Sequence, residues 1–270
     1  MYRLDGSLAR AGGVGAPACF DEADFGLREI GVTTYARSVL VNVDPTASPF
    51  VPNALGRALE PFAIEEFEVG RRDRYECAFN WKVLLENYSE NYHTPFVHPE
   101  LPVAGYEYPM AHDGPFVVAW DRPLDPRDAS ERALNESRPG APGWEHVADN
   151  AAAASFNNGV YLTMWPNTMC SAFAGFAATF RIAPTGPTTT VIEREYLWHP
   201  SVPQARRDAD YDATRRVVAQ DVAMCEAVQR TYDGGCSADG VLSTEHEQGV
   251  AHLHRLLVAA LDCGERALPW

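Results

Sequence analysis

The sequence predicts an α+β fold, in which a long helix packs on a curved antiparallel sheet. Strand-like segments are grouped between residues 157 and 199, and a long helical pattern follows between residues 203 and 232. Strands that are grouped apart from helices are typical of α+β proteins and not of alternating βαβ folds. The chain of 270 residues can bury one large core or two small ones, and its apolar fraction of 46% is that of an ordinary globular protein.

Residues 1–50 are expected to form β structure. The Asp5-Gly6 pair suits a tight turn, and the segment 38–44 alternates apolar and polar side chains before a proline. Residues 59–80 mix strand and turn signals. They lead into a segment with large side chains at helical spacing, namely Trp81, Leu84, Leu85 and Tyr88.

A polar stretch and three strands are predicted in the middle of the chain. Residues 121–155 are rich in proline, glycine and charge, and are expected to form a surface loop or lid. The candidate strands follow at 157–165, 171–183 and 188–199. The sequence PTGP at 184–187 is a turn signal, so the last two strands are expected to pair as a hairpin.

Two helices are predicted after the strands. Pro203 opens a long helix that reaches about residue 232, where Gly234-Gly235 ends it. A shorter amphipathic helix is expected at 244–261. No internal repeat and no glycine-rich phosphate loop is found in the sequence.

Composition narrows the classes of partner and the cell compartment. A net charge of −15 argues against a nucleic-acid or anionic membrane surface, because phosphate groups select for Lys and Arg. The first residues lack a leader-type apolar segment, and no apolar run approaches membrane-spanning length. The six cysteines form no Cys-x-x-Cys, Cys-x-His or Cys-x-x-His pair, so we expect a cytoplasmic protein without disulfides or structural zinc.

The segment 86–100, ENYSENYHTPFVHPE, contains two histidines five residues apart. On a helix, Glu86, Glu90 and His93 would share one face. His98 would point about 140° away from that face on a regular helix. A pair of histidines at this spacing is by itself weak evidence of a metal site, since one core and one surface histidine would give the same pattern.

Pro95 is expected to change this geometry. Proline disfavours helical geometry at the preceding Thr94 and removes a backbone donor, so the helix should end or kink just after His93. The chain would then fold back and bring His98 toward the same point. Two converging imidazoles indicate a metal site.

A third ligand is expected from the long helix. Glu226 is one turn before Arg230 and is expected to form a solvated pair, while Asp208, Asp210 and Asp212 lie among arginines and are expected at the surface. Asp221 differs because its helical neighbours are apolar: Val217, Val218, Met224, Cys225 and Val228. A buried lone carboxylate is costly unless it is paired or binds a metal. A hydrogen bond to a tyrosine or tryptophan is the alternative for Asp221.

His93, His98 and Asp221 together would leave open coordination positions. That set suits a non-haem Fe(II) that activates dioxygen, whereas structural zinc takes a closed four-coordinate site. A zinc hydrolase stays open as an alternative, although the HExxH pattern with its general-base glutamate is absent from the sequence.

These motifs resemble a known family. The stretch NWKVLLENYSENYHTPFVHPE (80–100) is similar to the signature of the catalytic domain of Rieske non-haem iron oxygenase α subunits. QDVAMCEAVQR (220–230) resembles the helix that supplies their carboxylate ligand, and the similarity runs through essentially the whole chain. The resemblance implies one catalytic domain over residues 1–270 with a helix-grip fold, an antiparallel sheet wrapped around a long helix.

The resemblance also implies roles for individual residues. His93, His98 and Asp221 match the ligands of mononuclear Fe(2+). Glu90 matches the acid that links the iron site to the Rieske centre of the neighbouring subunit. A glutamate at this position resembles the family members that act on quaternary amines. Asn87 matches an asparagine near the iron. The alternatives are a solvated helix acid for Glu90 and a capping amide for Asn87.

One part of the family pattern is missing from this sequence. Family members carry an N-terminal Rieske domain with Cys-x-His and Cys-x-x-His pairs, and this chain begins MYRLDG where that domain would end. We therefore expect no [2Fe-2S] cluster in the chain and an external electron donor, either a Rieske protein or a full-length α subunit with its reductase. The resemblance implies a homotrimer or a mixed oligomer.

The expected function is oxygen insertion into a C–H bond of a small organic substrate, which is hydroxylation or demethylation. One rival is a non-catalytic paralogue that stabilises a hetero-oligomer with a full-length α subunit. The other is a metal-dependent hydrolase. The pocket walls are expected near residues 102–120, in the strands at 157–183 and in the polar loop.

Overall fold

The computed structural model describes residues 1–13, 20–44, 49–99, 101, 106–123, 159–236 and 240–262. The chain divides into two compact units, Met1–Val51 and Pro52–Trp270. That the whole chain acts as one catalytic domain stays a prediction.

The first unit contains the predicted β structure together with one short helix. The 3-10 helix η1 (Glu22–Phe25) precedes an antiparallel hairpin of β1 (Gly31–Tyr35) and β2 (Ser38–Asn42). The two turn residues of the hairpin, Ala36 and Arg37, both have positive φ, which a two-residue turn needs to match the twist of the strands. Neither is a glycine or asparagine, so the sequence carries no sign of this turn.

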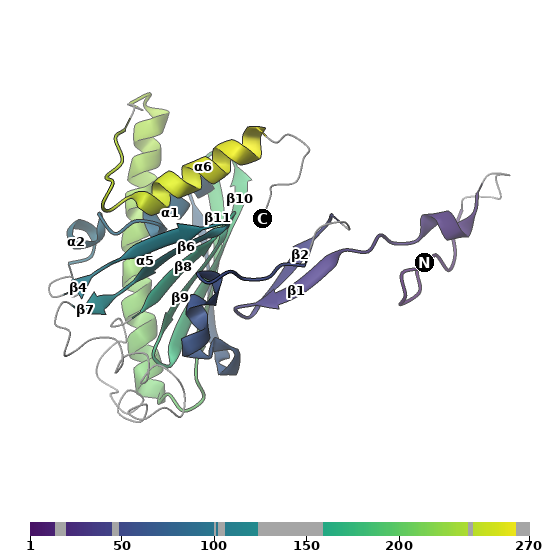
Figure 1. Cartoon of the computed structure of the whole chain (residues 1–270), viewed down its shortest axis with the longest axis horizontal. Helices are drawn as coiled ribbons and strands as arrows, with labels where there is room; N and C mark the ends of the chain where they lie inside the picture. Colours follow the sequence, from purple (N-terminus) through teal and green to yellow (C-terminus); the bar gives the residue numbers. More distant parts are fainter. Residues whose placement is uncertain are drawn as a thin grey trace. The chain divides into compact units, whose positions relative to one another are not determined.

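A seven-stranded antiparallel sheet forms the second unit, in the order β3-β11-β10-β9-β8-β6-β5 (Figure 1). The α+β prediction is therefore confirmed. A separate two-stranded pair, β4 with β7, has the bounds Tyr106–Glu107 and Arg122–Pro123. The seven strands are β3 (Glu68–Cys77), β5 (Met110–Asp113), β6 (Phe116–Trp120), β8 (Val160–Met164), β9 (Thr168–Phe173), β10 (Phe176–Gly186) and β11 (Thr189–Trp198).

The single strand predicted at 171–183 is wrong, because a tight turn divides this segment into β9 and β10. Gly175 has a φ of +74° in that turn. The strand ends next to this turn are buried and mostly apolar, which hides the turn from a hydrophobicity pattern. The turn predicted at 184–187 lies too early in the sequence, since β10 continues to Gly186 and β11 begins at Thr189. The β10–β11 hairpin itself is confirmed.

The mixed signals at 59–80 correspond to two 3-10 helices followed by an edge strand. η2 (Gly56–Phe62) and η3 (Ile64–Glu66) precede β3. A Cβ on Gly56 would lie 2.7 Å from the ring of Phe116, so glycine allows η2 to approach the sheet closely.

The described part of this unit contains four α-helices: α1 (Trp81–Tyr88), α2 (Thr94–Val97), α5 (Gln204–Asp233) and α6 (Gln248–Asp262). The long helix follows its prediction closely, because Pro203 is its N-cap and Gly234 its C-cap. The last helix begins later than predicted, after a turn in which the Ser243 hydroxyl accepts the N–H of Glu245 and His246. Figure 1 shows α5 running along the sheet and α6 crossing near one end of it.

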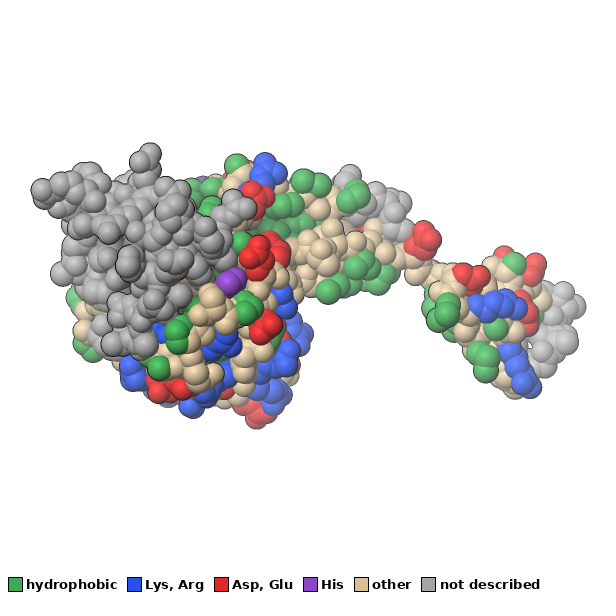
Figure 2. Space-filling model, turned by 90° about the horizontal axis from the view of Figure 1, so that it is seen from below, with side chains coloured by type: hydrophobic (Ala, Val, Ile, Leu, Met, Phe, Trp, Pro, Cys, Tyr) green, Lys and Arg blue, Asp and Glu red, His purple; other side chains and the backbone are tan. Residues whose placement is uncertain are grey.

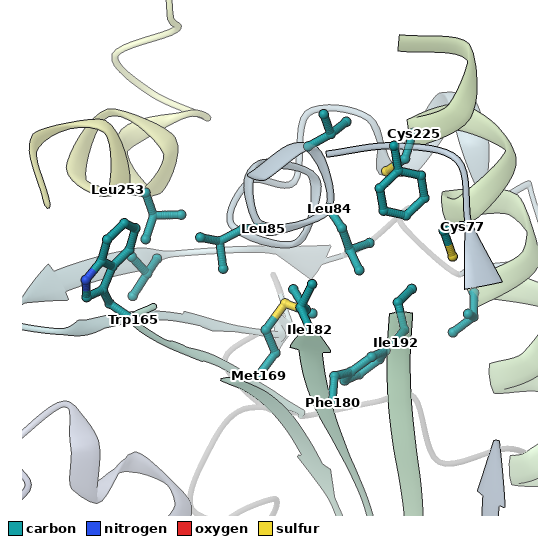
Figure 3. Packing of buried hydrophobic residues seen from close by; sticks show 14 residues of the cluster. Cys77, Leu84, Leu85, Trp165, Met169, Phe180, Ile182, Ile192, Cys225 and Leu253 are labelled. Carbon is teal, nitrogen blue, oxygen red and sulfur yellow. The ribbon is translucent and has the colours of Figure 1, made fainter. Parts of the chain in front are cut away.

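The core lies between the sheet and these helices. Leu84 and Leu85 of α1 point toward Met169 and Ile182 on the strands (Figure 3). Cys225 of α5 and Leu253 of α6 belong to the same buried cluster. The cluster holds α1 and α5 in contact, and the candidate metal ligands lie just beyond α1 and on α5.

Two predictions for acids of α5 are wrong. Asp210 is buried rather than at the surface, because Arg206 Nε and Trp198 Nε1 donate to its two oxygens at 2.9 and 3.1 Å. Glu226 accepts the backbone N–H of Ala78 at 3.3 Å, where a solvated pair with Arg230 was expected. Asp208 does lie near the surface and pairs with Arg71 at 2.6 Å, and Asp212 is exposed.

Basic and acidic side chains are intermixed on the face seen in Figure 2. Ion pairs of this exposed kind, such as Arg72–Glu195 and Arg74–Glu76, contribute little to stability. Among the described residues, no helix has the length and apolar character needed to cross a membrane. Of the loop predicted at 121–155, all but the first three residues lie outside the described part of the chain.

Candidate metal centre

The segment between α1 and α2 positions the first histidine. Helix α1 ends at Tyr88, where the buried Ser89 is the C-cap and its hydroxyl lies 3.0 Å from Thr163 Oγ1. The prediction of a helix that continues to His93, with Glu86 on the same face, is therefore wrong. Glu86 instead contacts His254 of α6 at 2.9 Å.

Glu90 organises the turn that follows. Its carboxylate accepts the backbone N–H groups of Tyr92 and of His93, the latter at 3.1 Å. The same carboxylate contacts the Nδ1 atom of His93. Glu90 therefore lies against the imidazole as predicted, but through a local turn and not through helical spacing. The alternative of a solvated acid is wrong, because the Glu90 side chain is only 11% exposed.

Pro95 acts in the opposite way to the prediction. It lies in the first turn of α2, where a helix does not need its missing N–H, and Thr94 is the first helical residue. His93 and His98 are the N-cap and C-cap of this single turn. One short helix therefore brings the two rings together, with their centroids 5.3 Å apart.

Asp221 of α5 completes the cluster. The ligand atoms of His93, His98 and Asp221 all lie within 4.8 Å of one another. Oδ1 of Asp221 is 3.0 Å from Nε2 of His98 and 3.6 Å from Nε2 of His93. Of the apolar neighbours predicted around Asp221, Val218 and Cys225 are buried, but Met224 is 40% exposed. The structure thus brings together the three predicted ligands.

Each imidazole has a second partner that sets its tautomer. Nδ1 of His98 lies 2.7 Å from Oε1 of Gln220, and Nδ1 of His93 contacts the Glu90 carboxylate. Both partner atoms are acceptors, so each neutral ring places its proton on Nδ1 and keeps a lone pair on Nε2. Gln220 was missed by the sequence analysis. Its position directly before the candidate ligand Asp221 was the only signal.

The donor set fits a metal ion. Oδ1 of Asp221 is buried and has no hydrogen-bond partner, although two Nε2 atoms lie beside it. With the protons of both rings on Nδ1, two nitrogen lone pairs and a carboxylate oxygen converge without a positive charge between them. A divalent cation that prefers imidazole and carboxylate ligands satisfies all three atoms.

In the metal-free protein, protons take the place of that charge. Burial lowers the pKa of His93, but the Asp221 and Glu90 carboxylates outweigh it and raise the pKa to about 9. Burial also opposes the ionised form of Asp221, yet the two imidazoles hold its pKa below the usual value. Metal binding at this centre therefore releases protons.

A pocket adjoins the centre, and the three candidate ligands form part of its wall. Asn87 also lines the pocket, and its role stays a prediction. The predicted wall regions contribute the side chains Tyr108, Asp121, Tyr161, Ser171 and Phe173. Arg194 of β11 and Thr214 and Val217 of α5 were not predicted to line it.

Comparison with known proteins identifies the family. The family model described as "Ring hydroxylating alpha subunit (catalytic domain)" matches residues 64–262. The chain belongs to this family. Members of the ring-hydroxylating α subunit family hold mononuclear iron in this domain, so the family and the donor set of the centre agree.

Curated relatives share modest identity with the chain. Choline monooxygenase of Arabidopsis thaliana is 23% identical over 272 residues, which cover 95% of this chain and 60% of the plant protein. The glycine betaine monooxygenase oxygenase subunit of Pseudomonas aeruginosa (strain UCBPP-PA14) is 31% identical over 157 residues, 57% of this chain and 33% of that protein. The chain therefore spans less than two thirds of the length of these relatives.

Solved structures of the family have the same fold. A quaternary ammonium Rieske monooxygenase aligns with a TM-score of 0.68 and 20% identity over 94% of this chain and 68% of that one. Naphthalene 1,2-dioxygenase from Rhodococcus sp. aligns with a TM-score of 0.55 and 17% identity over 88% of this chain and 63% of that one. The predicted helix-grip fold is confirmed.

Proposed function

We propose that this chain is the catalytic part of an oxygenase that holds Fe(II) through His93, His98 and Asp221. One observation carries the proposal: two Nε2 atoms face the buried, unpartnered Oδ1 of Asp221 at the wall of a pocket. The reaction is insertion of an oxygen atom into a C–H bond of a small organic molecule bound in that pocket.

The substrate is a small N-methylated compound. The relatives are named as choline, glycine betaine and carnitine monooxygenases, and their names support this class. Hydroxylation of a carbon beside nitrogen gives a product that loses the carbon, so such an activity is observed as demethylation. Hydroxylation at a carbon that bears oxygen gives an aldehyde hydrate.

The residues of the chain hold and orient the components of the reaction. A bound iron would supply one-electron chemistry toward dioxygen and an open position beside the pocket. Glu90 and Gln220 fix the two imidazole rings through Nδ1, so that both Nε2 atoms face Asp221. The buried Phe173 and the ring of Tyr161 line the pocket and limit the access of water to the reacting carbon.

Electrons come from a cluster outside these 270 residues. The sequence contains neither a Cys-x-His with Cys-x-x-His pair for a Rieske centre nor a dinucleotide-binding glycine fingerprint. Glu90 is the entry point, since its carboxylate contacts His93 from the turn that leads to the exposed Tyr92 and Phe96. A separate Rieske protein, or a full-length α subunit in a homotrimer or mixed oligomer, docks on this side.

Metal analysis and turnover test the proposal together. Protein loaded anaerobically with Fe(II) is expected to retain one iron per chain. With a Rieske donor, its reductase and NAD(P)H, it is expected to convert glycine betaine, choline or carnitine and to incorporate label from ¹⁸O₂. No product is expected with NAD(P)H alone. Multiple turnovers without the donor, or hydrolysis by a zinc-loaded protein, would contradict this assignment.

A further inference from the structure

Unpartnered polar atoms are concentrated in the wall of one pocket. Among the described residues, the buried side-chain polar atoms without a hydrogen-bond partner are Tyr88 Oη, Asp121 Oδ1, Arg194 Nε and Nη1, and Asp221 Oδ1. All four residues line the pocket beside the metal centre. The metal accounts for Asp221, but it does not account for the other three.

Arg194 is a buried positive charge on which an acid of the described residues, Asp221, acts without forming an ion pair. It is 2% exposed, and its guanidinium lies over the rings of Phe180 and Tyr196, with Cζ at 3.9 and 4.8 Å from the ring centroids. Aromatic faces stabilise a cation but do not satisfy the N–H groups at its edge. No carboxylate of the described residues forms an ion pair with it. A guanidinium does not deprotonate in proteins, so its free Nε–H and Nη1–H groups need acceptors, and a carboxylate satisfies both these groups and the buried charge.

Asp121 is a second buried charge-bearing group in the same wall, just after β6. It is 8% exposed, and its Oδ2 accepts the N–H of Gly159 at 3.3 Å and the hydroxyl of Tyr161 at 3.2 Å. Its Oδ1 has no partner. A Cβ on Gly159 would lie 3.1 Å from Oδ2 and 2.3 Å from the ring of Phe173, so glycine makes room for this carboxyl group.

The two groups belong to separate parts of the pocket wall. Asp121 lies beside Gly159 in the sheet, and the row of paired residues that starts there reaches β11 at Trp198. Arg194 is four residues from Trp198 along β11. Tyr88 lies between the two groups, because its ring centroid is 6.3 Å from that of Tyr161, which bonds to Asp121, and 5.5 Å from that of Phe180, which lies under Arg194. The pocket thus has a cationic part and an acidic, aromatic part.

We propose that the pocket selects a zwitterionic substrate, with Arg194 binding its carboxylate and Asp121 facing its cationic nitrogen. Arg194 forms charge-assisted hydrogen bonds with the carboxylate, which fit a planar guanidinium edge. The nitrogen lies against Asp121 and the rings of Tyr88 and Tyr161, where carboxylate and aromatic faces both attract a cation. The inference rests on the proposed function, since the ligand is the substrate of the adjoining metal centre.

Four isosteric probes separate the two charges. Glycine betaine carries both, choline lacks the carboxylate, 3,3-dimethylbutanoate lacks the cationic nitrogen, and 3,3-dimethylbutan-1-ol lacks both. Dissociation constants are measured by calorimetry on the Fe(II)-loaded chain at about pH 8, above the raised pKa of Asp121, under anaerobic conditions without an electron donor. Glycine betaine is expected to bind at least about ten-fold tighter than each of the others, as hydrogen bonds to charged groups warrant. Choline binding as tightly as glycine betaine would overturn the role of Arg194.

Variants assign each charge to its residue. Arg194→Gln is expected to remove most of the preference for glycine betaine over choline, and Asp121→Asn the preference for glycine betaine over 3,3-dimethylbutanoate. The exposed Arg72, which pairs with Glu195, supplies the control Arg72→Gln, which should leave both ratios unchanged. If Arg194→Gln weakens all four probes equally, the arginine only supports the fold and the inference fails.

The outcome is independent of turnover. If the wild-type chain prefers glycine betaine as expected but forms no oxygenated product with any donor, the zwitterion site stands and the proposed function fails. If it oxygenates substrates while binding the four probes equally, the function stands and this inference fails. If Arg194→Gln does not fold, Arg194→Lys and the probe series on the wild-type chain still test the inference. Equal affinities of the wild-type chain for choline and glycine betaine are enough to overturn it.

Discussion

Asp210 and Asp221 are two acids on one helix with opposite hydrogen-bonding states: Asp210 is buried, and Asp221 is partly buried with its Oδ1 atom out of solvent. They are eleven residues apart on α5, about three turns, and therefore point in nearly the same direction. Asp210 has a donor on each oxygen, Arg206 Nε and Trp198 Nε1. Asp221 keeps a buried Oδ1 without a hydrogen-bond partner, beside two imidazole nitrogens.

The difference shows how a structural acid is distinguished from a functional one. Secondary structure does not separate the two residues, and their side chains differ little in exposure, at 1% for Asp210 and 17% for Asp221. The saturation of the oxygens does, because a satisfied carboxylate stabilises the fold and an unsatisfied one is tolerated where a ligand completes it. The five predictions below either break this contrast or sharpen it, and they run from the largest expected effect to the smallest.

Asp221→Ala is expected to abolish iron binding while the protein stays folded, because two neutral imidazoles alone do not form the site. The measurement is the iron content after anaerobic loading with Fe(II) and gel filtration, with circular dichroism as the check on folding. Full iron occupancy in this variant would show that the carboxylate is not a ligand.

Asp210→Ala is expected to have the reverse effect. It removes the carboxylate that accepts from the buried Arg206, which costs about 3–5 kcal/mol in the free energy of unfolding, and it leaves the three ligands in place. Denaturant unfolding of the metal-free protein measures the loss, and iron content is expected to stay at one per chain. The exposed Asp212 supplies the control Asp212→Ala, which should change neither quantity. A loss of iron in Asp210→Ala with normal stability would erase the contrast.

Asp121 extends the comparison to an acid that is only partly satisfied. Burial raises its pKa to about 7, against the hydrogen bonds from Gly159 and Tyr161 that lower it. The folded state therefore holds a proton that the unfolded state releases near pH 4, so stability falls as the pH rises from about 4 to about 7 and the loss then stays constant. A shift of this size corresponds to roughly 4 kcal/mol.

Asp121→Asn is expected to remove this loss. The stability of the variant relative to wild type should increase with pH up to about 7 and then level off, as measured by urea unfolding across that range. Taking the difference between the two proteins cancels the titration of all other groups. A difference that does not change with pH would mean that Asp121 ionises normally in the fold.

The smallest expected effects concern the two acceptors behind the imidazoles. Gln220→Ala is expected to weaken iron affinity by about 10–100-fold, because His98 loses the partner that orients it. Glu90→Gln should keep the iron and the fold, since the amide oxygen still accepts from Nδ1, yet lower turnover with a reduced donor at least about ten-fold. Unchanged turnover in Glu90→Gln would reduce the acid to a structural acceptor for the turn.

Much of the fold could be predicted from local signals. Pro203 and Gly234 bound the long helix because caps act on their immediate neighbours. The β9–β10 turn at Gly175 was missed because buried strands on both sides give one continuous apolar run. In the site, the His93–His98 spacing was informative, but the inferred kink was not the cause, since Pro95 begins a helix there.

The polar residues of the pocket were the least predictable. Asp121, Tyr161 and Arg194 are single polar positions within strands or at their ends, and such positions normally face solvent. Arg194 lies between Ile192 and Tyr196 on the same face of β11, the face that packs against the helices. Nothing in the neighbouring sequence marks this arginine as buried. Gln220 likewise gains its role from His98, which lies 122 positions earlier in the chain.

By itself the sequence determined the donor types, the five-residue spacing of the histidines and the ends of the long helix, because these depend on neighbours within one or two turns. The apolar neighbours of Asp221 also indicated it as the acid that meets the imidazoles. Only the tertiary structure decided that Asp210 is buried against Arg206 and Trp198 and that one oxygen of Asp221 stays without a hydrogen-bond partner. Desolvation and saturation of a carboxylate are set by groups that arrive from distant strands and loops, so identical aspartates on one helix acquire different chemistry.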